Sequence, residues 1–431
     1  MNIDLLFSFS GYSVKHVKIS DHPEQRVRVY LNRDDAKPFL CMKCGTPMRR
    51  LHSRLRCWAN DLSITSFKTT IYFKRHKGRC HQCKKIRLES VDFLATESLH
   101  TTKRLSAWLG AMCEFAAVSR VAEFVELPKQ TLWRADLKRM QEYFSKYEIP
   151  PVSNISVDEV YARAWHDNDE TTYDRYFTLI TDLDAHKVIW VEESRSKAAL
   201  DRFFQRIGAE GRSKIKVVAI DQHDEYVRSI AEHVPHAVTV FDRFHLMKAF
   251  EEAANDTRKR LFKMIPGKDV KEIARGSNRF IFLKAASKRT SEEASLMATI
   301  QKNEAFLNLE MIKERMISLF NEQTADDARK VFEQIGAWIW EAGFPELKKW
   351  WSNLNKVWAT VANFFRYRVT TSLSEGINNV VKSIKRRAFG FRNMEYFRLK
   401  ILQVCGLMSS RFMYQTGGWT PQAQALLVEI K

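Results

Sequence analysis

Three acidic residues occupy positions at which carboxylates can bind a divalent metal ion. Asp158 follows the strand-like run 155–157, Asp221 follows the apolar run 215–220, and Glu375 lies near the start of a predicted helix. Acids at the carboxyl ends of neighbouring strands face one crevice, and two such carboxylates repel each other unless a cation lies between them. Mg²⁺ or Mn²⁺ suits this arrangement, because it accepts a few carboxylates and leaves positions for phosphate oxygens and water. The pattern predicts a divalent-cation site that can accept a phosphate oxygen, with these three acids as ligands.

A run of cations follows Glu375 on the same predicted helix. Taken alone, Glu375 is better explained as a cap on a solvated basic helix. The two aspartates favour its role as a third metal ligand, and the cations then contact a nucleic-acid backbone. These cations are Lys382, Lys385, Arg386 and Arg387. Four competing acids rank lower because they point to the wrong face, sit in a hairpin turn or lie on an outer strand: Glu159, Asp182, Asp184 and Asp242.

Two C-x-x-C pairs, Cys41 with Cys44 and Cys80 with Cys83, predict one structural zinc ion held by four thiolates. A strand-like run at 63–73 spans the long interval between the pairs as a β-ribbon. Many basic residues surround this ribbon, which favours a module that contacts DNA. The alternative is a set of free or redox-active thiols, but a redox role needs only one pair.

The segment 119–140 has the pattern of a helix, a turn at Leu127–Lys129 and a second helix. Short helical hairpins often share this pattern, but its position directly after a basic cysteine module favours a DNA-binding helix-turn-helix. The second helix would present four side chains to a major groove: Gln130, Thr131, Arg134 and Lys138.

The predicted elements of residues 151–250 alternate as β-β-β-α-β-α-β-α, which is the order of an RNase-H-like fold. We therefore predict a multidomain α+β protein with an RNase-H-like α/β catalytic domain that is interrupted by an α-helical insertion. The predicted parts are a zinc-binding β module, a helix-turn-helix domain, the first part of the catalytic core, the helical insertion, and a second part of the core that carries Glu375 and a tail. Their ranges are 1–95, 96–150, 151–250, 251–366 and 367–431.

Charge and composition agree with a nucleic-acid partner. The net charge is +19, and residues 1–150 hold 27 basic against 15 acidic side chains, whereas residues 151–250 hold 13 against 17. A basic protein with an acidic middle fits DNA-binding parts beside a metal site. Seven cysteines, an odd number, argue against a disulfide framework. No apolar run reaches the length of a membrane span, and residues 1–13 do not resemble a signal peptide, so we expect a cytoplasmic, nucleoid-associated protein without a membrane partner.

Several of these motifs together resemble the transposases of the ISL-three family of bacterial insertion sequences. They are the cysteine module, the helix-turn-helix, VDE at 157–159, FDRFH at 241–245, and SEGINN with KRRAFGFRN at 374–393. The resemblance implies a DDE transposase whose triad is Asp158, Asp221 and Glu375, with Asp242 and His245 supporting the site. One departure is the run 370–374, which lacks the Asn expected near the Ser before Glu375.

The resulting hypothesis is in-line attack on DNA, first by water and then by the freed 3′-hydroxyl, with two metal ions about 4 Å apart. The zinc module and the helix-turn-helix would select the terminal inverted repeats, target DNA would be the second substrate, and a homodimer or higher oligomer would form the synaptic complex. Two alternatives remain: a non-catalytic DNA-binding regulator built from the same modules, and an RNase-H-like nuclease or resolvase.

Overall fold

The computed structural model describes residues 6–95, 100–162, 175–221, 223–264, 279–369 and 372–406. The chain forms two compact units. One contains the residues up to Glu148 together with those from Ser383 onward, and the other contains Ile149–Lys382. The segment 367–431, which the sequence analysis treats as one domain, is therefore divided between the two units.

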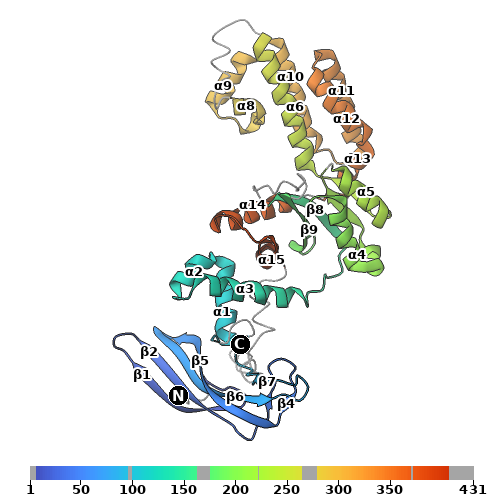
Figure 1. The fold of residues 1–431 in the computed structure, drawn as a ribbon. Coiled ribbons are helices and arrows are strands. Elements are labelled where there is room, and N and C mark those ends of the chain that lie inside the picture. Colours follow the sequence, from blue (N-terminus) through green and yellow to red (C-terminus); the bar gives the residue numbers. More distant parts are fainter. Residues whose placement is uncertain are drawn as a thin grey trace. The chain divides into compact units, whose positions relative to one another are not determined.

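The first unit begins with a five-stranded sheet of order β1-β2-β6-β5, in which β7 pairs with β6 (Figure 1). Its strands are β1 (Tyr12–Ser20), β2 (Arg26–Arg33), β5 (Arg50–Ile64), β6 (Phe67–Arg79) and β7 (Ile86–Leu88). A separate short hairpin pairs β3 (Phe39–Leu40) with β4 (Pro47–Met48). The long antiparallel pair β5–β6 is the β-ribbon that the sequence predicts between the two cysteine pairs.

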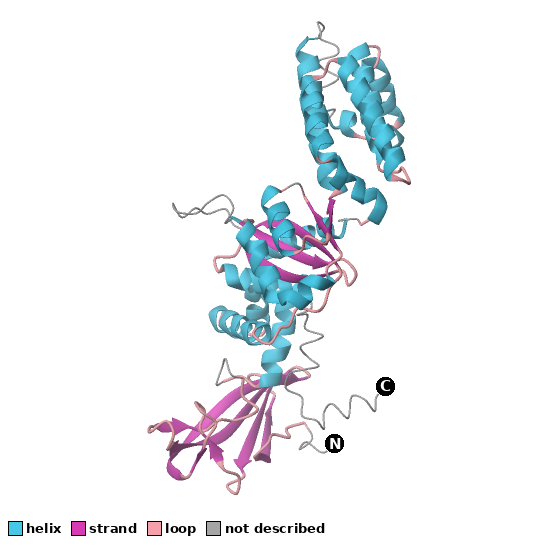
Figure 2. Cartoon of the chain, turned by 90° about the vertical axis from the view of Figure 1, so that its right-hand side faces the viewer, coloured by secondary structure: helices cyan, strands magenta, loops and turns pink. Residues whose placement is uncertain are grey.

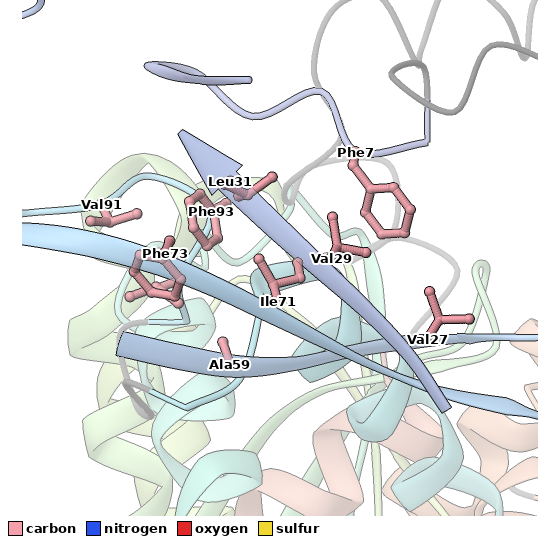
Figure 3. Close-up of a cluster of buried hydrophobic side chains, with 10 residues drawn as sticks. Phe7, Val27, Val29, Leu31, Ala59, Ile71, Phe73, Val91 and Phe93 are labelled. Carbon is pink, nitrogen blue, oxygen red and sulfur yellow. The ribbon is translucent and has the colours of Figure 1, made fainter. Parts of the chain in front are cut away.

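Alternation along the strands gives this sheet its core. Val27, Val29 and Leu31 of β2 are buried, whereas the residues between them are more exposed. Successive side chains of a strand point to opposite faces, so all three valine and leucine side chains lie on one face. Figure 3 shows them beside Ile71 and Phe73 of β6, with Phe7, Ala59, Val91 and Phe93 completing the cluster.

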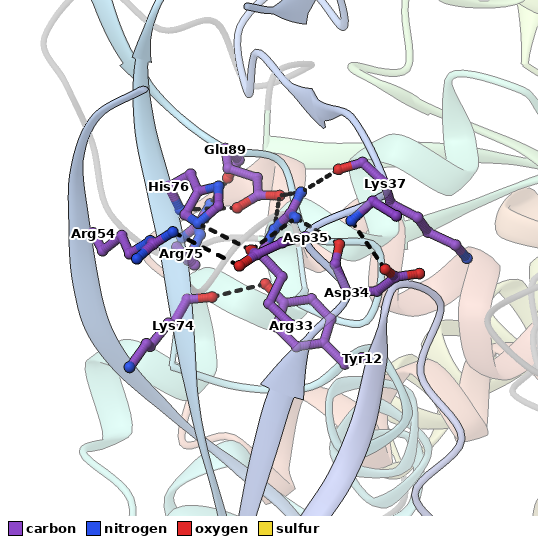
Figure 4. A network of polar contacts seen from close by, with 11 residues as sticks. Tyr12, Arg33, Asp34, Asp35, Lys37, Arg54, Lys74, Arg75, His76 and Glu89 are labelled. Carbon is purple, nitrogen blue, oxygen red and sulfur yellow. Dashed lines mark hydrogen bonds and ion pairs between the residues drawn. The ribbon is translucent and has the colours of Figure 1, made fainter. Parts of the chain in front are cut away.

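Glu89, just after β7, connects several strands of this sheet (Figure 4). Its carboxylate accepts hydrogen bonds from the Arg33 side chain at 2.8 Å and from the backbone N–H of His76 at 2.8 Å. Its backbone carbonyl accepts from the guanidinium of Arg75, which is 2% exposed. Because Glu89 also forms a β-bridge with Cys41, this network holds the first cysteine pair against the sheet.

Four helices complete the described part of the first unit: α1 (Lys103–Phe115), α2 (Val118–Phe124), α3 (Lys129–Phe144) and α15 (Met394–Cys405). The second and third lie where the sequence predicts two helices and a turn, but α3 begins at Lys129, inside the predicted turn, and continues four residues past the predicted end at Met140. Their apolar faces meet α1 in a core that includes Leu105, Leu109, Val121 and Leu132. The exposed face of α3 is thereby left to polar and basic side chains.

A buried ion pair joins α3 to α15. Lys400 lies 2.6 Å from Asp136, and their side chains are 4% and 0% exposed. Lys400 also donates to the carbonyl of Cys113 at 3.0 Å, and the hydroxyl of Tyr396 donates to Asp136 at 2.7 Å. Burial opposes ionisation of Asp136, but Lys400 and Arg139 hold its pKa below the ordinary value. Both charges are therefore compensated within the protein.

We expect Lys400→Met to lower the free energy of unfolding of this unit by up to about 3–5 kcal/mol, because it removes the closer of the two cations beside the buried charge of Asp136 and leaves Arg139 at 3.3 Å. Urea denaturation of the full chain, followed by circular dichroism, would measure the loss. The double variant Asp136→Asn with Lys400→Met should recover part of it, since the buried charge is then removed as well. A double variant no more stable than Lys400→Met would contradict this account.

The second unit is built on a five-stranded sheet of order β10-β9-β8-β11-β12. The strands are β8 (Asn154–Tyr161), β9 (Tyr176–Asp182), β10 (Lys187–Glu193), β11 (Val217–Ile220) and β12 (Val238–Phe241). Strand β9 pairs antiparallel with β8 and with β10, whereas β11 pairs parallel with β8 and with β12. Helices α4 (Lys197–Lys214) and α5 (Asp224–His233) connect β10 to β11 and β11 to β12. The alternation of strands and helices is the one the sequence predicts.

Between β12 and α14 (Ser372–Arg387) the described residues are mainly helical, and Figure 2 shows them as a bundle of helices. The elements are α6 (Arg243–Met264), α8 (Arg279–Leu283), η4 (Ala286–Lys288), α9 (Ser291–Ile300), α10 (Glu304–Leu319), α11 (Ala325–Ala342), α12 (Pro345–Lys356) and α13 (Trp358–Tyr367). Asn363 of α13 donates to the carbonyl of Thr239 in β12 at 2.8 Å, so the last of these helices returns the chain to the sheet. Among the described residues, no helix is long and apolar enough to cross a membrane.

Candidate active site and metal centre

Three aspartates lie at one level across the parallel strands of the second unit. Ile220 of β11 is in register with Val157 of β8 and with Phe241 of β12. The next residue in each strand or strand end is an aspartate: Asp158, Asp221 and Asp242. Parallel strands place equivalent positions side by side, so these acids share the carboxyl edge where ligand sites form in such sheets. Asp158 lies within β8, which continues to Tyr161, rather than at the end of the strand as expected.

Helix α14 contacts β8 beside these acids. The hydroxyls of Ser374 and Ser156 are 3.0 Å apart, and the side-chain amide of Asn378 donates to Asp158 at 2.9 Å. Ser374 and Asn378 are four residues apart and therefore lie on one face of the helix. Glu375 follows Ser374 in the first turn, and its side chain is exposed. The start of α14 is thus held against the strand that carries Asp158.

The pKa values of the two central aspartates are raised above the ordinary value for an aspartate. Burial raises the pKa of Asp158 to about 6, against the opposing hydrogen bond from the backbone N–H of Glu159. Burial, followed by the charge of Glu159, also raises the pKa of Asp221. The charges of Asp221 and Asp242 further raise the pKa of Asp158, and the charge of Asp242 further raises that of Asp221. Such a set of desolvated, mutually repelling carboxylates is stabilised by positive charge.

The oxygen atoms present fit a hard divalent cation. Oδ1 of Asp221 and Oδ1 of Asn378 are buried and have no hydrogen-bond partner in the described part of the chain. Carboxylate and amide oxygens are the donors that Mg²⁺ and Mn²⁺ prefer. Asp158, Asp221 and Glu375 do not form a group whose ligand atoms all lie within 4.8 Å of one another; within the described ranges only the cysteine cluster meets that criterion.

We expect Asp158→Asn to stabilise the protein at pH 7 when divalent cations are chelated. Because the folded-state pKa of about 6 lies above the ordinary value of 3.8, the folded protein loses stability as the pH rises through this window. The neutral amide avoids that loss, which is on the order of 3 kcal/mol at most. Chemical denaturation in EDTA between pH 4.5 and pH 8 would show the advantage shrinking toward low pH. An advantage independent of pH would contradict this assignment.

His245 is paired with the outermost aspartate. Its Nδ1 lies 2.7 Å from Oδ2 of Asp242, and this hydrogen bond raises the pKa of His245. The backbone N–H of Phe244 donates to the other oxygen of Asp242 at 3.0 Å. Both oxygens of Asp242 are therefore engaged at the start of α6. Asp242 and His245 are thus joined to each other at the end of β12, and their supporting role stays a prediction.

In the first unit the four predicted cysteines form a compact cluster. Sγ of Cys41 lies 3.9 Å from that of Cys83, and Sγ of Cys44 lies 3.5 Å from those of Cys80 and Cys83. Four sulfurs placed tetrahedrally at about 2.3 Å from a zinc ion are about 3.8 Å apart. The observed separations match that geometry and are too long for disulfides. The cluster is a possible four-cysteine metal site, and it confirms that the two C-x-x-C pairs come together.

Two tight turns position these sulfurs. Gly45 has a φ of 73° and donates to the carbonyl of Cys41 at 2.8 Å. In the second pair Lys84 takes the equivalent left-handed conformation, with a φ of 56°, and Cys80 donates to the carbonyl of Lys85 at 3.0 Å. The backbone N–H of Cys83 points to Sγ of Cys80 at 3.3 Å. An N–H group directed at sulfur stabilises the thiolate that binds metal.

Most of the predicted DNA-contacting side chains are exposed, and one of the exposed ones, Arg387, is also hydrogen-bonded within its own unit. On α3, Gln130, Thr131, Arg134 and Lys138 are all exposed, while Leu132, Asp136 and Met140 face the interior. On α14, Lys382 and Arg386 are exposed, and burial lowers the pKa of Lys385. Arg387 donates to the carbonyls of Glu114 and Phe115 at the end of α1, the former at 2.9 Å. Arg387 thus has a structural partner within its own unit.

Sequence reasoning did not assign a role to Asn378 or to the Ser156–Ser374 pair. Both serines are buried, and their contact fixes the first turn of α14 on β8. The available signal was the motif SEGINN, in which Ser374 and Asn378 are one helical turn apart on either side of Glu375. Glu159 was ranked low, yet its charge contributes to the raised pKa of Asp221.

Comparison with known proteins identifies the family. A model of DDE transposases of the ISL3 type, described as "Transposase", matches residues 155–401. The chain belongs to this transposase family. It is similar to the transposase for insertion sequence element IS1001 from Bordetella parapertussis, with 26% identity over 402 residues, or 93% of this chain and 96% of the relative. It is also similar to the transposase for IS1557 from Mycobacterium tuberculosis, with 22% identity over 316 residues and 67% coverage of each chain. The matched range of the ISL3-type family spans all three predicted catalytic acids.

Proposed function

We propose that this chain is an enzyme that cleaves and joins DNA at the ends of an insertion sequence, with Asp158, Asp221 and Glu375 as ligands of Mg²⁺ or Mn²⁺. The observation that carries the proposal is the placement of Asp158 and Asp221 side by side on parallel strands, both with raised pKa values, in a transposase of the ISL3-type family. The strand order β10-β9-β8-β11-β12 supports an RNase-H-like catalytic fold.

The site residues have separate tasks in this proposal. Bound divalent ions would supply activation of the attacking hydroxyl and stabilisation of the leaving oxygen. Asp158 and Asp221 present oxygens from the rigid sheet, and Glu375 presents its carboxylate from the first turn of α14. Asn378 holds one oxygen of Asp158 and thereby orients that carboxylate. No protein nucleophile is required, because water and then the DNA 3′-hydroxyl attack the phosphate.

DNA binding is assigned to both units. We propose that the cysteine cluster holds one structural zinc ion and that its basic ribbon, together with Gln130, Thr131, Arg134 and Lys138 of α3, selects the terminal inverted repeats. The exposure of all four α3 side chains supports this assignment. Lys382, Lys385 and Arg386 would contact the backbone near the scissile phosphate. Arg387 would contribute indirectly, because its guanidinium donates hydrogen bonds to carbonyls at the end of α1 and so holds the end of α14 against that helix.

An assay of joining with a precleaved transposon end tests the proposal against both alternatives. The expected result is transfer of the 3′-end into a second duplex with Mg²⁺ or Mn²⁺ and none in EDTA. A regulator would bind the end without joining it, and a nuclease or resolvase would cut DNA without strand transfer. Either of those outcomes would overturn the proposal.

A further inference from the structure

The loop that joins α14 to α15 carries an aromatic ring without cover. Phe389 is 98% exposed, and its φ of 56° lies in the left-handed region. Its N–H donates to the carbonyl of Arg386 at 3.0 Å, and that of Gly390 donates to Lys385 at 2.9 Å. These two bonds form a Schellman motif, which ends a helix and places one residue in the left-handed conformation. That position is occupied here by Phe389.

Phenylalanine is a poor choice for this position on local grounds. Glycine is the usual residue there, because a side chain in the left-handed region is strained. An uncovered ring also leaves a large apolar surface in water. Residues that are locally unfavourable and make no compensating contact within the fold are often found at functional sites. Phe389 is unfavourable in both of these ways, which points to a partner outside the chain.

The other phenylalanine of the loop behaves in the opposite way. Phe391 stacks on Phe397 with ring centroids 4.4 Å apart and planes at 9°, and it lies 5.9 Å from the ring of Tyr396. Phe391 thus anchors the loop to α15. The anchored loop holds Phe389 in a defined place, so its exposure is not a consequence of a loose chain end.

The charge around Phe389 identifies the class of partner. Between Glu375 and Glu395 there are five lysines and arginines and no acid: Lys382, Lys385, Arg386, Arg387 and Arg392. Arg386 and Arg392, on either side of the ring in sequence, are both exposed. Aromatic rings in a cationic setting bind single-stranded nucleic acid, because bases stack on the ring while cations contact phosphates. Bases in an intact duplex are already stacked on each other, so the base concerned is unpaired.

We propose that Phe389 stacks on an unpaired nucleobase of the bound DNA, with Arg386 and Arg392 contacting the adjacent phosphates. This inference rests on the proposed function in that the ligand is DNA, and it adds a binding site that is separate from the acidic cluster. The proposal also explains why Phe389 occupies the left-handed position of the Schellman motif. A fixed turn holds the ring in place before DNA binds, so little conformational freedom is lost on binding.

The test compares two DNA ligands with the full-length protein. One is a fully paired duplex of a transposon end, and the other is the same duplex with a short single-stranded tail that contains 2-aminopurine. Phe389→Gly should weaken binding of the tailed DNA by about 5- to 100-fold and that of the paired duplex by less than about 2-fold. The 2-aminopurine fluorescence should be quenched by the unsubstituted protein and less by this variant. Phe389→Tyr should behave like the unsubstituted protein, because it keeps the ring.

Folding does not obscure this test. Glycine relieves the strain at a positive φ, so Phe389→Gly should not lower the melting temperature. Ile19→Ala serves as a control, because Ile19 is an apolar residue of the same unit whose side chain is also exposed, at 68%. This control variant should bind both DNA ligands as tightly as the unsubstituted protein. Equal weakening on both DNAs, or no weakening, would overturn the inference. A loss of self-association in sedimentation without a change in DNA preference would assign the ring to a second copy of the chain instead.

Failure of this inference is distinguishable from failure of the proposed function. If Phe389→Gly has no selective effect while the unsubstituted protein joins precleaved ends in Mg²⁺, only the stacking site is wrong. If the unsubstituted protein binds neither DNA, both are wrong.

Discussion

Asp221→Asn is expected to lower DNA cleavage and joining by at least about 10³-fold while leaving binding of the transposon end unchanged. A metal ion at the reacting phosphate contributes several kcal/mol to the transition state, and each 1.4 kcal/mol changes the rate about tenfold. Oδ1 of Asp221 is buried and has no hydrogen-bond partner in the described structure, so this oxygen is available to a metal ion. The variant keeps the shape of the side chain and removes its charge. Joining of a labelled precleaved end and a gel-shift assay would measure the two effects.

Asp224 provides a matched control for this experiment. It lies three residues after Asp221, is exposed, and begins α5. Asp224→Asn should keep joining within a few-fold, because only a favourable interaction with the helix terminus, worth about 0.3–1 kcal/mol, is reduced. Retained joining by Asp221→Asn would remove Asp221 from the metal site. Equal loss in both variants would indicate a general effect of charge on this edge of the sheet.

Cys80→Ser is expected to abolish stoichiometric zinc binding and to destabilise the cysteine module. Cys80 is completely buried, and its Sγ lies 3.5 Å from that of Cys44, so a hydroxyl there removes one of four ligands. Structural zinc contributes about 10–16 kcal/mol to the folding of small zinc-binding peptides. Here the sheet has its own apolar core, and we expect the disruption to centre on the two turns of the cluster. Elemental analysis of the purified protein should give one zinc per chain before substitution and close to none after it.

Cys57 provides the control, because it belongs to the same module and lies outside the cluster. It is located in β5, where burial raises its pKa. Cys57→Ser should retain one zinc ion per chain and normal affinity for the transposon end, whereas Cys80→Ser should bind the end at least tenfold more weakly. Zinc retained by Cys80→Ser, or lost equally from both variants, would be incompatible with a four-thiolate site.

Local patterns were sufficient for much of the architecture. The two C-x-x-C pairs predict a cluster because thiolates two residues apart can share a metal, and the structure brings all four sulfurs together. The strand order around β8 also follows from the sequence, since helical crossovers place β11 beside β8 and put Asp221 next to Asp158. The helix-turn-helix pattern corresponds to α2 and α3. Such a pattern can be recognised in the sequence because the apolar spacing of both helices lies within one short segment.

Other features depend on contacts between distant segments, which residue spacing does not encode. Nothing in the spacing of residues 367–431 indicates that the chain passes from one unit to the other within α14. The bonds of Arg387 to α1 and the burial of Lys400 against Asp136 both join segments far apart in the chain, and the residues around these two cations do not indicate either contact. The alignment of Asp242 with Asp221 follows from the register between β12 and β11. That register is set by backbone pairing and cannot be read from the side-chain pattern.

The proposed catalytic acids show the same division. Their residue types and their places on strands and a helix predict a divalent-cation site, because carboxylate oxygens suit a hard divalent cation. The sheet register then decides which acids are neighbours, and burial decides that Asp158 and Asp221 have raised pKa values. Residue identity is a local property and can be read along the chain. Desolvation and repulsion depend on every segment packed around a group, and so only the folded protein determines them.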